Sequence, residues 1–524
     1  MQIHRLRHAA TATLVLLLSV LLCAPPASAA DRSDEAPPDR LAKIDSYIRD
    51  RMEATGTPGL AYAVVDANGP VHQRAWGKDG RGAPVTADTP FLWGSVAKPI
   101  TASAVMTLVQ DGRLGLDDRA VDHLPDFRFG GREHASKITV RHLLNQTAGL
   151  PESATFKVAD CLDPDCPRPG ERVEALDDVR PLGPPGAKYA YTSANYLLLA
   201  AVVESVTGRP YAEYLRQSVL EPAGMKGAIA DRDTALKRQL APGHQYLWGR
   251  PAAIAAGVDD HGAAYGYTGG DLNDLAAFAA LQLRSGKTAD GRTVLTPESV
   301  RQMRASGSLQ PGGEKTGYGF GWRVGGLEAP LDNAIWHTGA TPGYAGMLFL
   351  LPEQGLALVL EQNLHGLLQD EAVMQVGFGA AHLLAGGEAP GDDPSTLLYD
   401  VTVWGATALA LLLLAAAVRS ALLVRRAAAP VSLPRLIAGT SAWVIAGALP
   451  GTLLAMVMKF MGAGQALAWV PDAFIALCVA AGAGVLVIAL RFALAVRRFR
   501  SVREQRAPAS RQTSPVREPS GAPA

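Results

Sequence analysis

Apolar residues near the start of the chain repeat first with the spacing of a helix and then with that of strands. Four of them step along one helical face: Leu41, Ile44, Ile48 and Met52. The next two segments, 60–65 and 71–76, are apolar and partly β-branched, and the Asn68-Gly69 turn separates them. This pattern predicts an N-terminal helix followed by a β-hairpin.

Helical spacing then dominates the middle of the chain. A helix is expected from Ser95 towards Gly112, and a mostly helical pattern continues to Leu144. Strand-like segments return between Tyr318 and Glu361. Early strands, a central helical block and late strands predict an α/β sheet interrupted by a helical insertion. Further helices are expected at 195–206, 211–220, 272–283 and 297–303.

The last third of the chain contains three long apolar segments, at 401–418, 436–458 and 473–490. Each is near the length that a bilayer core requires, and no amphipathic partner helices surround them as they would surround buried core helices. We therefore expect three transmembrane helices within residues 401–490. The preceding residues 385–400, rich in Gly, Pro and Asp, are expected to be a linker.

Charge sets the expected orientation of these segments. Arginines lie between the first and second segments and again after the third, which makes both regions cytoplasmic by the positive-inside rule. We expect residues 491–524 to be a basic, disordered cytoplasmic tail. Residues 1–29 combine early arginines, a short apolar run and Ala27-Ser28-Ala29, which predicts a cleaved secretory signal. The expected product is a multi-pass plasma-membrane protein whose domain at 41–384 is extracytoplasmic.

Composition excludes some classes of partner. The chain has 49 basic and 49 acidic residues, so no net charge points to nucleic acid. Of the four cysteines, Cys161 and Cys166 lie in CLDPDC between proline-rich turns. We predict that they form a small disulfide-closed loop, with two unpaired thiols as the alternative. Two cysteines offer too few ligands for a metal, and we expect no metal and no cofactor.

Candidate chemistry centres on FLWGSVAKPIT, where Ser95 and Lys98 form the single S-x-x-K of the sequence. A spacing of three puts both side chains on one helical face. A lysine can take the serine proton only if desolvation or nearby cations lower its pKa. Apolar neighbours can supply that desolvation: Phe91, Trp93, Val96 and Ile100. The alternative interpretation is a helix cap followed by a surface lysine.

Two later segments offer further polar candidates. Tyr191 and Ser193 lie just before an apolar helix, where a phenol near a lysine can relay protons, although a tyrosine at such a place is also ordinary packing. In AIWHTGATPGY, the residues around His337 favour a strand, and Gly339 allows a ligand to approach the backbone. An edge strand there can bind a substrate by main-chain pairing.

Several motifs in this order resemble those of the serine β-lactamase and penicillin-binding-protein superfamily. The closest branch contains class C β-lactamases, HTG-type D-alanyl-D-alanine carboxypeptidases and related esterases. The resemblance covers 41–384 and implies a β-lactamase/transpeptidase-like antiparallel sheet flanked by helices, with a helical insertion. The motifs are SVAK, VTADTPFLWGS, HLLNQTAGLP, PGAKYAY, YGFGW and HTGATPGY.

The resemblance also implies roles for individual residues. Ser95 resembles the acylated nucleophile, Lys98 its proton acceptor, and Tyr191 the general base and acid. His337, Thr338 and Gly339 resemble the third motif of the family. The amide of Ala340 would join that of Ser95 in an oxyanion hole, which typically contributes several kcal/mol to the transition state.

Two departures from the family pattern matter. The tyrosine motif usually reads Y-x-N, but here Ser193 stands in place of the asparagine, and a hydroxyl cannot donate two hydrogens as an amide can. His337 stands where lactamase-like relatives carry lysine, so it would hold a substrate carboxylate only when protonated. A literal KTG at 315–317 follows a glycine-rich segment that makes a poor strand, and we reject it as the third motif.

We therefore expect a membrane-anchored extracytoplasmic serine hydrolase that acts through an acyl-enzyme. D-alanyl cell-wall peptides are the leading substrates, and small esters, amides or weakly hydrolysed β-lactams of the same fold are the alternative. A penicillin-binding receptor is an alternative of another class. An inactive scaffold is disfavoured because Ser95, Lys98 and Tyr191 are all present. The expected partners are peptidoglycan peptides or β-lactams and the lipid membrane.

Overall fold

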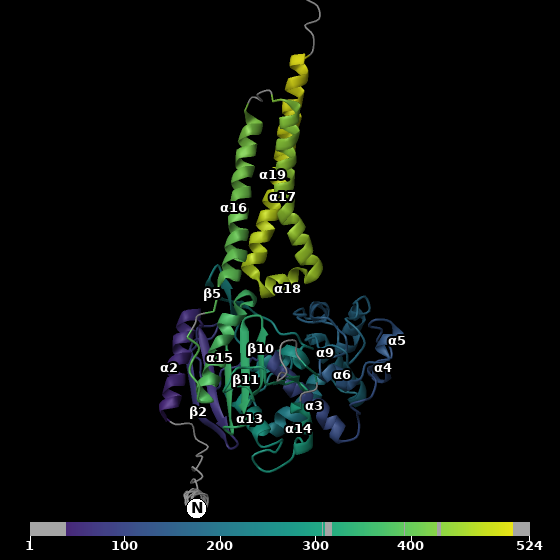
Figure 1. Cartoon of the computed structure of the whole chain (residues 1–524), viewed down its shortest axis with the longest axis vertical. Helices are drawn as coiled ribbons and strands as arrows, with labels where there is room; N and C mark the ends of the chain where they lie inside the picture. The colour runs from purple at the N-terminus through teal and green to yellow at the C-terminus, as the bar shows by residue number, and fades with distance from the viewer. Residues whose placement is uncertain (1–37, 306–307, 310–316, 392–393, 427–430, 507–524) are drawn as a thin grey trace, which may run out of the picture.

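An eight-stranded antiparallel sheet forms the centre of the N-terminal two thirds, with the strand order β2-β1-β12-β11-β10-β9-β8-β7. The computed structural model describes residues 38–305, 308–309, 317–391, 394–426 and 431–506 (Figure 1). The strands are β1 Gly59–Asp66, β2 Gly69–Gly77, β7 Ser308–Leu309, β8 Gly317–Tyr318, β9 Arg323–Val324, β10 Ile335–Thr341, β11 Tyr344–Leu351 and β12 Leu356–Gln362. The expected hairpin is β1–β2, and β1 also pairs with β12 near the end of the domain.

Helices cover both faces of this sheet. On one face, α2 (Pro38–Thr55) and α15 (Asp370–Leu384) pack together and bury one core with the sheet (Figure 1). A second core lies on the other face, against α13 (Leu272–Leu283) and the helical insertion. The fold class is therefore confirmed as an α/β fold with an antiparallel sheet, flanking helices and a helical insertion.

The insertion begins directly after the short strand β3 (Phe91–Leu92), which pairs with β6 (Gly269–Gly270). A short hairpin, β4 (Gly243–Leu247) with β5 (Arg250–Ala255), lies in the chain between the insertion helices and β6. The helices of this region are α3 Ala97–Gln110, α4 Ala120–His123, α5 Arg132–Ala135, α6 Val140–Leu144, α7 Thr155–Val158, α8 Pro169–Arg172, α9 Ser193–Thr207, α10 Tyr211–Leu215, α11 Glu221–Ala223 and α12 Arg232–Lys237, and α14 Pro297–Arg304 lies further along the chain.

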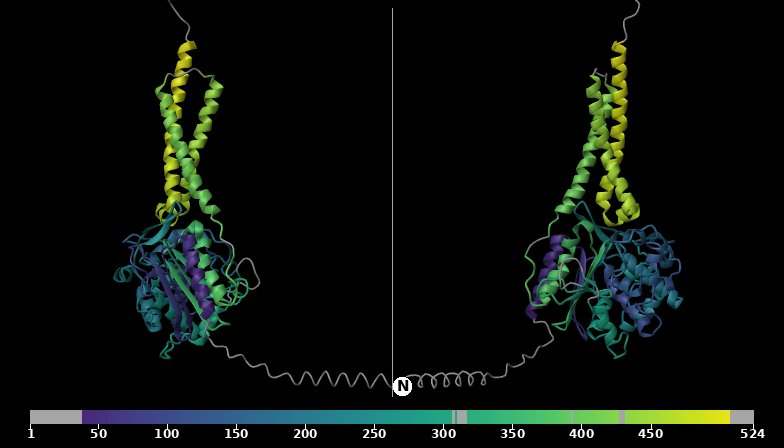
Figure 2. Two further views of the ribbon diagram at one scale, coloured as in Figure 1. Left: turned by 90° about the vertical axis from the view of Figure 1, so that its left-hand side faces the viewer. Right: turned by 45° about the vertical axis from the view of Figure 1, so that its right-hand side comes forward.

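Four helices follow the sheet domain, and we call them the C-terminal helical region: α16 Leu397–Arg425, α17 Leu433–Phe460, α18 Gly462–Trp469 and α19 Pro471–Arg506. Three of them, α16, α17 and α19, are long and apolar enough to cross a membrane, with mean hydropathies of 2.2, 1.7 and 2.7. They rise from one end of the domain, and the short α18 lies at their base beside the domain (Figures 1 and 2).

Two predicted boundaries differ from the structure. Helix α16 begins at Leu397, so the last four residues of the predicted linker 385–400 are helical. Helix α19 continues to Arg506, so residues 491–506 are helical and not part of a disordered tail. Arginine and alanine have high helix propensity, which lets a helix that starts in the apolar segment continue through the basic one. The predicted signal at 1–29, the residues 507–524 and most of the rejected KTG lie outside the described residues.

A buried carboxyl group supports the turn that precedes Ser95. Glu361 of β12 has no exposed surface, and its Oε2 accepts a hydrogen bond from Trp93 Nε1 at 2.8 Å. Burial raises the pKa of Glu361 well above its usual range, which the hydrogen bond from Trp93 only partly offsets. The protonated form is therefore the one that the fold stabilises.

We predict that Glu361→Gln stabilises the protein at neutral pH. A raised folded-state pKa gives stability that is fully present below the unfolded-state pKa of about 4.3 and is lost as pH rises towards the folded value. Because glutamine does not titrate, the difference in unfolding free energy between the variant and the wild type should grow by up to about 1.4 kcal/mol per pH unit in that window. Urea unfolding between pH 4 and pH 8 measures it, and a difference that stays constant with pH contradicts the prediction.

Candidate active site

Ser95 lies in a tight 3-10 turn, Gly94–Val96, that leads directly into α3. It is the one partly exposed residue in the stretch 91–100, whose other members are buried. Its Oγ lies 2.8 Å from Lys98 Nζ, so the predicted spacing does bring the two side chains together. The serine hydroxyl is thus within reach both of solvent and of a potential base.

Lys98 has no exposed surface. Its Nζ donates to the carbonyl of Tyr265 at 2.8 Å and lies 4.9 Å from the centre of the Tyr191 ring. Burial lowers the pKa of Lys98 well below its usual value, the positive charge of Arg323 lowers it further, and Asp160 acts in the opposite direction. A neutral amine beside a serine hydroxyl can accept its proton.

The ring of Tyr191 faces Lys98 Nζ. The Tyr191 hydroxyl is buried, and burial raises its pKa, with Arg323 and Ser95 acting against that shift. Gln146 fixes the backbone after it, because its Oε1 accepts from Thr192 N at 3.1 Å and from Asn195 Nδ2 at 2.5 Å. A buried phenol of high pKa in this position can carry a proton between the nucleophile and a leaving group.

Strand β10 approaches the Ser95 turn so closely that two glycines are required. A Cβ at Gly94 would lie 2.1 Å from Ala340 N, and a Cβ at Gly339 would lie 2.2 Å from Ser95 N. Gly94 also has a φ of +55°, which disfavours other residues. Strand β9 pairs only with the first two residues of β10, so the backbone at Gly339 and Ala340 lies beside the Ser95 turn beyond that pairing. An oxyanion hole made by the amides of Ser95 and Ala340 requires such a close approach, and the hole itself stays a prediction.

His337 is buried in the wall of the site. Its Nδ1 lies 2.6 Å from the carbonyl of Thr338 and its Nε2 lies 3.3 Å from the hydroxyl of Tyr318, which fits a neutral ring that donates from Nδ1 and accepts at Nε2. Burial lowers the pKa of His337 well below its usual value, and the charge of Arg323 lowers it further. This geometry does not support the hypothesis that a protonated His337 holds a substrate carboxylate.

Arg323 is a residue that sequence reasoning missed. It belongs to β9 and is partly exposed, and its guanidinium carbon lies 5.3 Å from the ring centres of both Tyr191 and Trp336. Its charge acts on the pKa values of Lys98, Tyr191 and His337. Arg323 directly follows YGFGW, and that position is the signal that could have drawn attention to it.

The remaining predicted site residues are Thr338, Ala340 and Ser193. Alternation along β10 turns the side chains of Thr338 and Ala340 to the face opposite His337 and Gly339, so Ala340 can contribute its backbone only. Ser193 begins α9 and is largely buried, and its amide donates to Thr155 Oγ1 at 3.0 Å. Among the described residues, no group of three or more His, Cys, Asp or Glu side chains could hold a metal ion.

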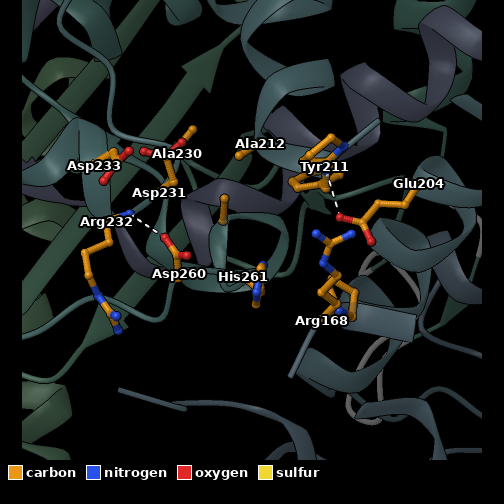
Figure 3. Close-up of a pocket in the computed structure, with 13 residues that line it drawn as sticks. Arg168, Glu204, Tyr211, Ala212, Ala230, Asp231, Arg232, Asp233, Asp260 and His261 are labelled. Atoms are coloured by element: carbon orange, nitrogen blue, oxygen red, sulfur yellow. Dashed lines mark hydrogen bonds between the residues drawn. The ribbon is translucent and has the colours of Figure 1, made fainter. Parts of the chain in front are cut away.

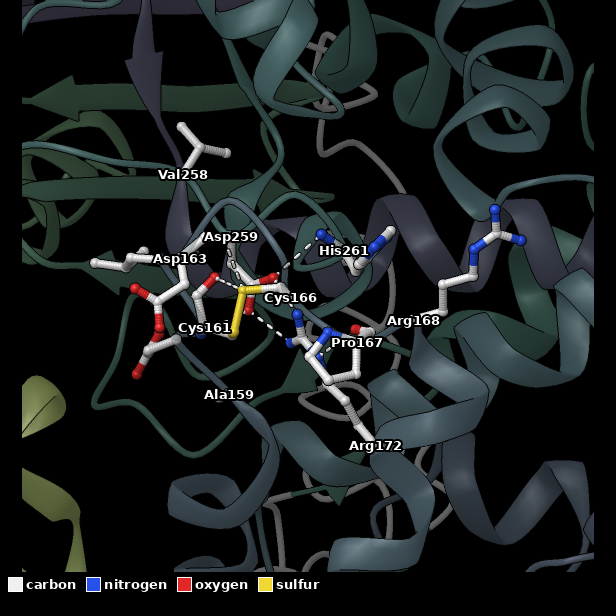
Figure 4. Close-up of a disulfide and its surroundings, with 12 residues drawn as sticks. Ala159, Cys161, Asp163, Cys166, Pro167, Arg168, Arg172, Val258, Asp259 and His261 are labelled. Carbon is white, nitrogen blue, oxygen red and sulfur yellow. Dashed lines mark hydrogen bonds and ion pairs between the residues drawn. A yellow bond between two sulfur atoms is a disulfide. The ribbon is translucent and has the colours of Figure 1, made fainter.

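A disulfide joins Cys161 and Cys166 in the structure, beside a buried ion pair (Figure 4). Arg172 donates to both carboxylate oxygens of Asp259, each at 2.7 Å. Asp259 also accepts from the amide of Cys161 and from the hydroxyl of Tyr265. The disulfide loop is therefore tied to the residue whose carbonyl contacts Lys98.

A cavity of about 400 Å³ with a charged lining lies apart from these groups (Figure 3). Ser95, Lys98 and Tyr191 do not line it. Two of its carboxylates are held by backbone amides, Glu204 by that of Tyr211 at 2.9 Å and Asp260 by that of Arg232 at 2.8 Å. The cavity is thus lined by charged side chains but by none of the candidate catalytic residues.

Residues 44–375 match the family described as Beta-lactamase. The chain belongs to the Beta-lactamase family. It is 32% identical over 333 residues to penicillin-binding protein 4 of Amycolatopsis lactamdurans, covering 61% of this chain and 85% of that protein. It is 25% identical to protein flp of Staphylococcus aureus strain MW2, covering 62% of this chain and 64% of that relative's length. The chain is accordingly a serine hydrolase of the β-lactamase and penicillin-binding-protein superfamily.

Solved structures share the fold of this Beta-lactamase family member. An octameric penicillin-binding protein homologue from Pyrococcus abyssi aligns with a TM-score of 0.57 and 22% identity, over 70% of this chain and 81% of that one. EstCE1, a hydrolase with promiscuous acyltransferase activity, aligns with a TM-score of 0.55 and 21% identity, over 66% of this chain and 99% of that one. These likenesses concern the fold.

We predict that Lys98→Arg nearly abolishes acylation of Ser95 although it keeps a positive charge. A guanidinium cannot lose its proton in the working pH range, so it cannot take the serine proton. A loss of about 10²-fold or more is expected, as for removal of a general base. The measurement is the rate of labelling by an active-site serine probe, with circular dichroism to show that the variant is folded. Labelling at the wild-type rate would mean that Lys98 has a structural role.

Proposed function

We propose that this protein is a membrane-anchored extracytoplasmic serine hydrolase that forms an acyl-enzyme on Ser95. The observation that carries the proposal is the 2.8 Å contact between Ser95 Oγ and the fully buried Lys98 Nζ. An amine that burial holds neutral can take a proton from a serine hydroxyl at moderate pH. The family membership supports the same reaction class.

The remaining groups divide the steps of acyl transfer between them. Lys98 accepts the proton as Ser95 Oγ attacks the substrate carbonyl. The amides of Ser95 and Ala340 stabilise the oxyanion that forms. Tyr191, whose ring lies 4.9 Å from Lys98 Nζ, passes a proton to the leaving group and later helps a water molecule attack the acyl-enzyme.

Arg323 supports a substrate that ends in a carboxylate. It is a partly exposed cation beside Tyr191, and arginine pairs with carboxylates through two parallel hydrogen bonds. Neutral His337 lacks the charge for this task. D-alanyl cell-wall peptides end in such a carboxylate, so a carboxypeptidase-like activity is our leading substrate proposal. Small esters and β-lactams are the alternative acyl donors.

Charge asymmetry supports the proposed orientation. Arginines at the α16–α17 connection and at the end of α19 favour the cytoplasm, and α18, at the opposite end of the helices, lies beside the catalytic domain (Figure 1). The catalytic domain and α18 then share the external side, where cell-wall peptides occur.

We predict that Ser95→Ala removes covalent labelling by penicillin or a fluorophosphonate without unfolding the protein. Intact-mass spectrometry of wild type and variant with D-Ala-D-Ala peptides, penicillins and esters measures it. Sustained product release by the wild type supports an enzyme, whereas a single burst per molecule would favour a receptor. An alanine variant that labels at the wild-type rate would show that Ser95 is not the nucleophile.

Arg323→Gln should raise the KM for a peptide acid by about 10-fold or more, because a hydrogen-bonded pair with a charged group contributes about 1.5–3 kcal/mol. The KM for the matched peptide amide should change little. The control is His337→Gln, measured with the same two peptides, which should not discriminate acid from amide. An equal change for acid and amide in the Arg323 variant would remove the carboxylate proposal and favour neutral esters.

The orientation predicts opposite labelling of two single cysteines in a Cys478→Ser background. Ala463→Cys in α18, an exposed position, should react with a membrane-impermeant maleimide in intact cells. Arg426→Cys, after α16, should react only after lysis. The reverse pattern would place the catalytic domain in the cytosol and contradict a cell-wall substrate.

A further inference from the structure

The short helix α18 forms two hydrogen bonds with one segment of the catalytic domain. Trp469 Nε1 donates to Asp160 Oδ2 at 2.8 Å, and Gln465 Nε2 donates to the carbonyl of Ala159 at 2.7 Å. Ala159 and Asp160 directly precede the disulfide loop that begins at Cys161. Asp160 has a φ of +61°, a left-handed conformation that is uncommon for residues other than glycine.

The same segment contacts two tyrosines, and one of them, Tyr265, contacts Lys98. Asp160 Oδ1 accepts from the hydroxyl of Tyr267 at 2.8 Å, and the amide of Asp160 donates to the hydroxyl of Tyr265 at 2.9 Å. The carbonyl of Tyr265 accepts from Lys98 Nζ at 2.8 Å. Trp469, Asp160, Tyr265 and Lys98 are therefore linked in series, each residue hydrogen-bonded to the next, from α18 to the nitrogen that lies beside Ser95 Oγ.

A second contact follows a parallel route to Tyr191. The ring of Phe460, at the end of α17, lies 4.8 Å from that of Phe156 in α7. In the same helix, Thr155 Oγ1 accepts from Ser193 N at 3.0 Å and shares a hydrogen bond of 3.0 Å with Thr192 Oγ1. The backbone that follows Tyr191 is thus attached to the residues that the C-terminal helical region touches.

We propose that α18 is part of the catalytic architecture: through Trp469 it holds Asp160 as a positioning residue for Lys98, so that full activity of the hydrolase requires the C-terminal helical region. This inference rests on the proposed function, in which Lys98 is the base. It gives the helical region a role beyond attachment to a membrane. Asp160 acts through Tyr265, and Tyr267, whose ring packs against that of Tyr265, also holds the Asp160 carboxylate.

Electrostatics supports the same link. The negative charge of Asp160 raises the pKa of Lys98, against the larger effect of burial and the effect of Arg323. The other titratable groups around Lys98 are Tyr191, Tyr196 and His337. Burial raises the pKa of Asp160 itself, and the hydrogen bonds from Trp469 and Tyr267 oppose that rise and so favour the ionised form. Loss of the Trp469 bond therefore disturbs both the position and the charge of this carboxylate.

The chain offers a matched control on the same boundary. Trp248, in the turn between β4 and β5, donates its indole nitrogen to Thr407 Oγ1 of α16 at 2.8 Å. It thus contributes to attachment of the helical region, but by a contact that involves neither Asp160 nor the segment around it. Trp469→Phe and Trp248→Phe each remove one indole hydrogen bond and keep an aromatic ring.

The experiment compares the two variants and the wild type as full-length proteins in detergent micelles, with acylation followed by stopped-flow fluorescence. Trp469→Phe should lower the acylation rate constant about tenfold, as for loss of one hydrogen bond to a charged group, with little change in the apparent affinity for the probe. Trp248→Phe should change it by less than about twofold, within the range of a dispensable hydrogen bond. Equal rate constants in the two variants, whether both fast or both slow, would overturn the inference.

A second variant keeps the test decisive if Trp469→Phe does not fold. Asp160→Asn removes the charge that raises the pKa of Lys98, so the acidic limb of the acylation profile should move to lower pH while the maximal rate falls. An acidic limb and a maximal rate like those of the wild type would overturn the inference. Failure of the wild type to label at all would instead overturn the proposed function, so the two failures are distinguishable.

Discussion

The burial of Lys98 is the constraint on which the rest of the active site depends. An ammonium group without exposed surface costs several kcal/mol in desolvation, so the protein favours the neutral amine. The positive charge of Arg323 acts in the same direction as burial, whereas the carbonyl of Tyr265 and the faces of Tyr191 and Tyr196 hold the nitrogen in place. The serine hydroxyl, at 2.8 Å, then has a base beside it.

That constraint explains why distant parts of the chain must meet at one point. The Ser95 turn follows β3, whereas the strand that faces it, β10, arrives only after the helical insertion has been completed. Gly94 in the Ser95 turn and Gly339 in β10 allow the backbones of these two segments to approach each other closely. The buried hydrogen bond between Trp93 and Glu361 attaches the turn to the sheet. The two amides can converge because no side chain separates the elements that carry them.

The boundary between the catalytic domain and the C-terminal helical region combines apolar contacts with several hydrogen bonds. Besides the contacts of α18, the turn between β4 and β5 donates from Trp248 N and Gly249 N to Asp472 and to the hydroxyl of Tyr399. Directional hydrogen bonds fix an orientation more narrowly than apolar contact does, because they weaken steeply with angle. An arrangement of this kind suits a helical region that supports the site.

The sequence by itself determined what local spacing and length can encode. Ser95 and Lys98 share a helical face because they are three residues apart, the apolar segments of α16, α17 and α19 are long enough to be recognised without a structure, and the ordered motifs indicate the fold. The neutrality of His337, the closeness of Arg323 to Tyr191 and the link from Trp469 to Lys98 could not be read in this way. All three depend on burial and on contacts between residues far apart in the chain. Burial and these contacts arise only when the tertiary structure excludes water and brings those residues together.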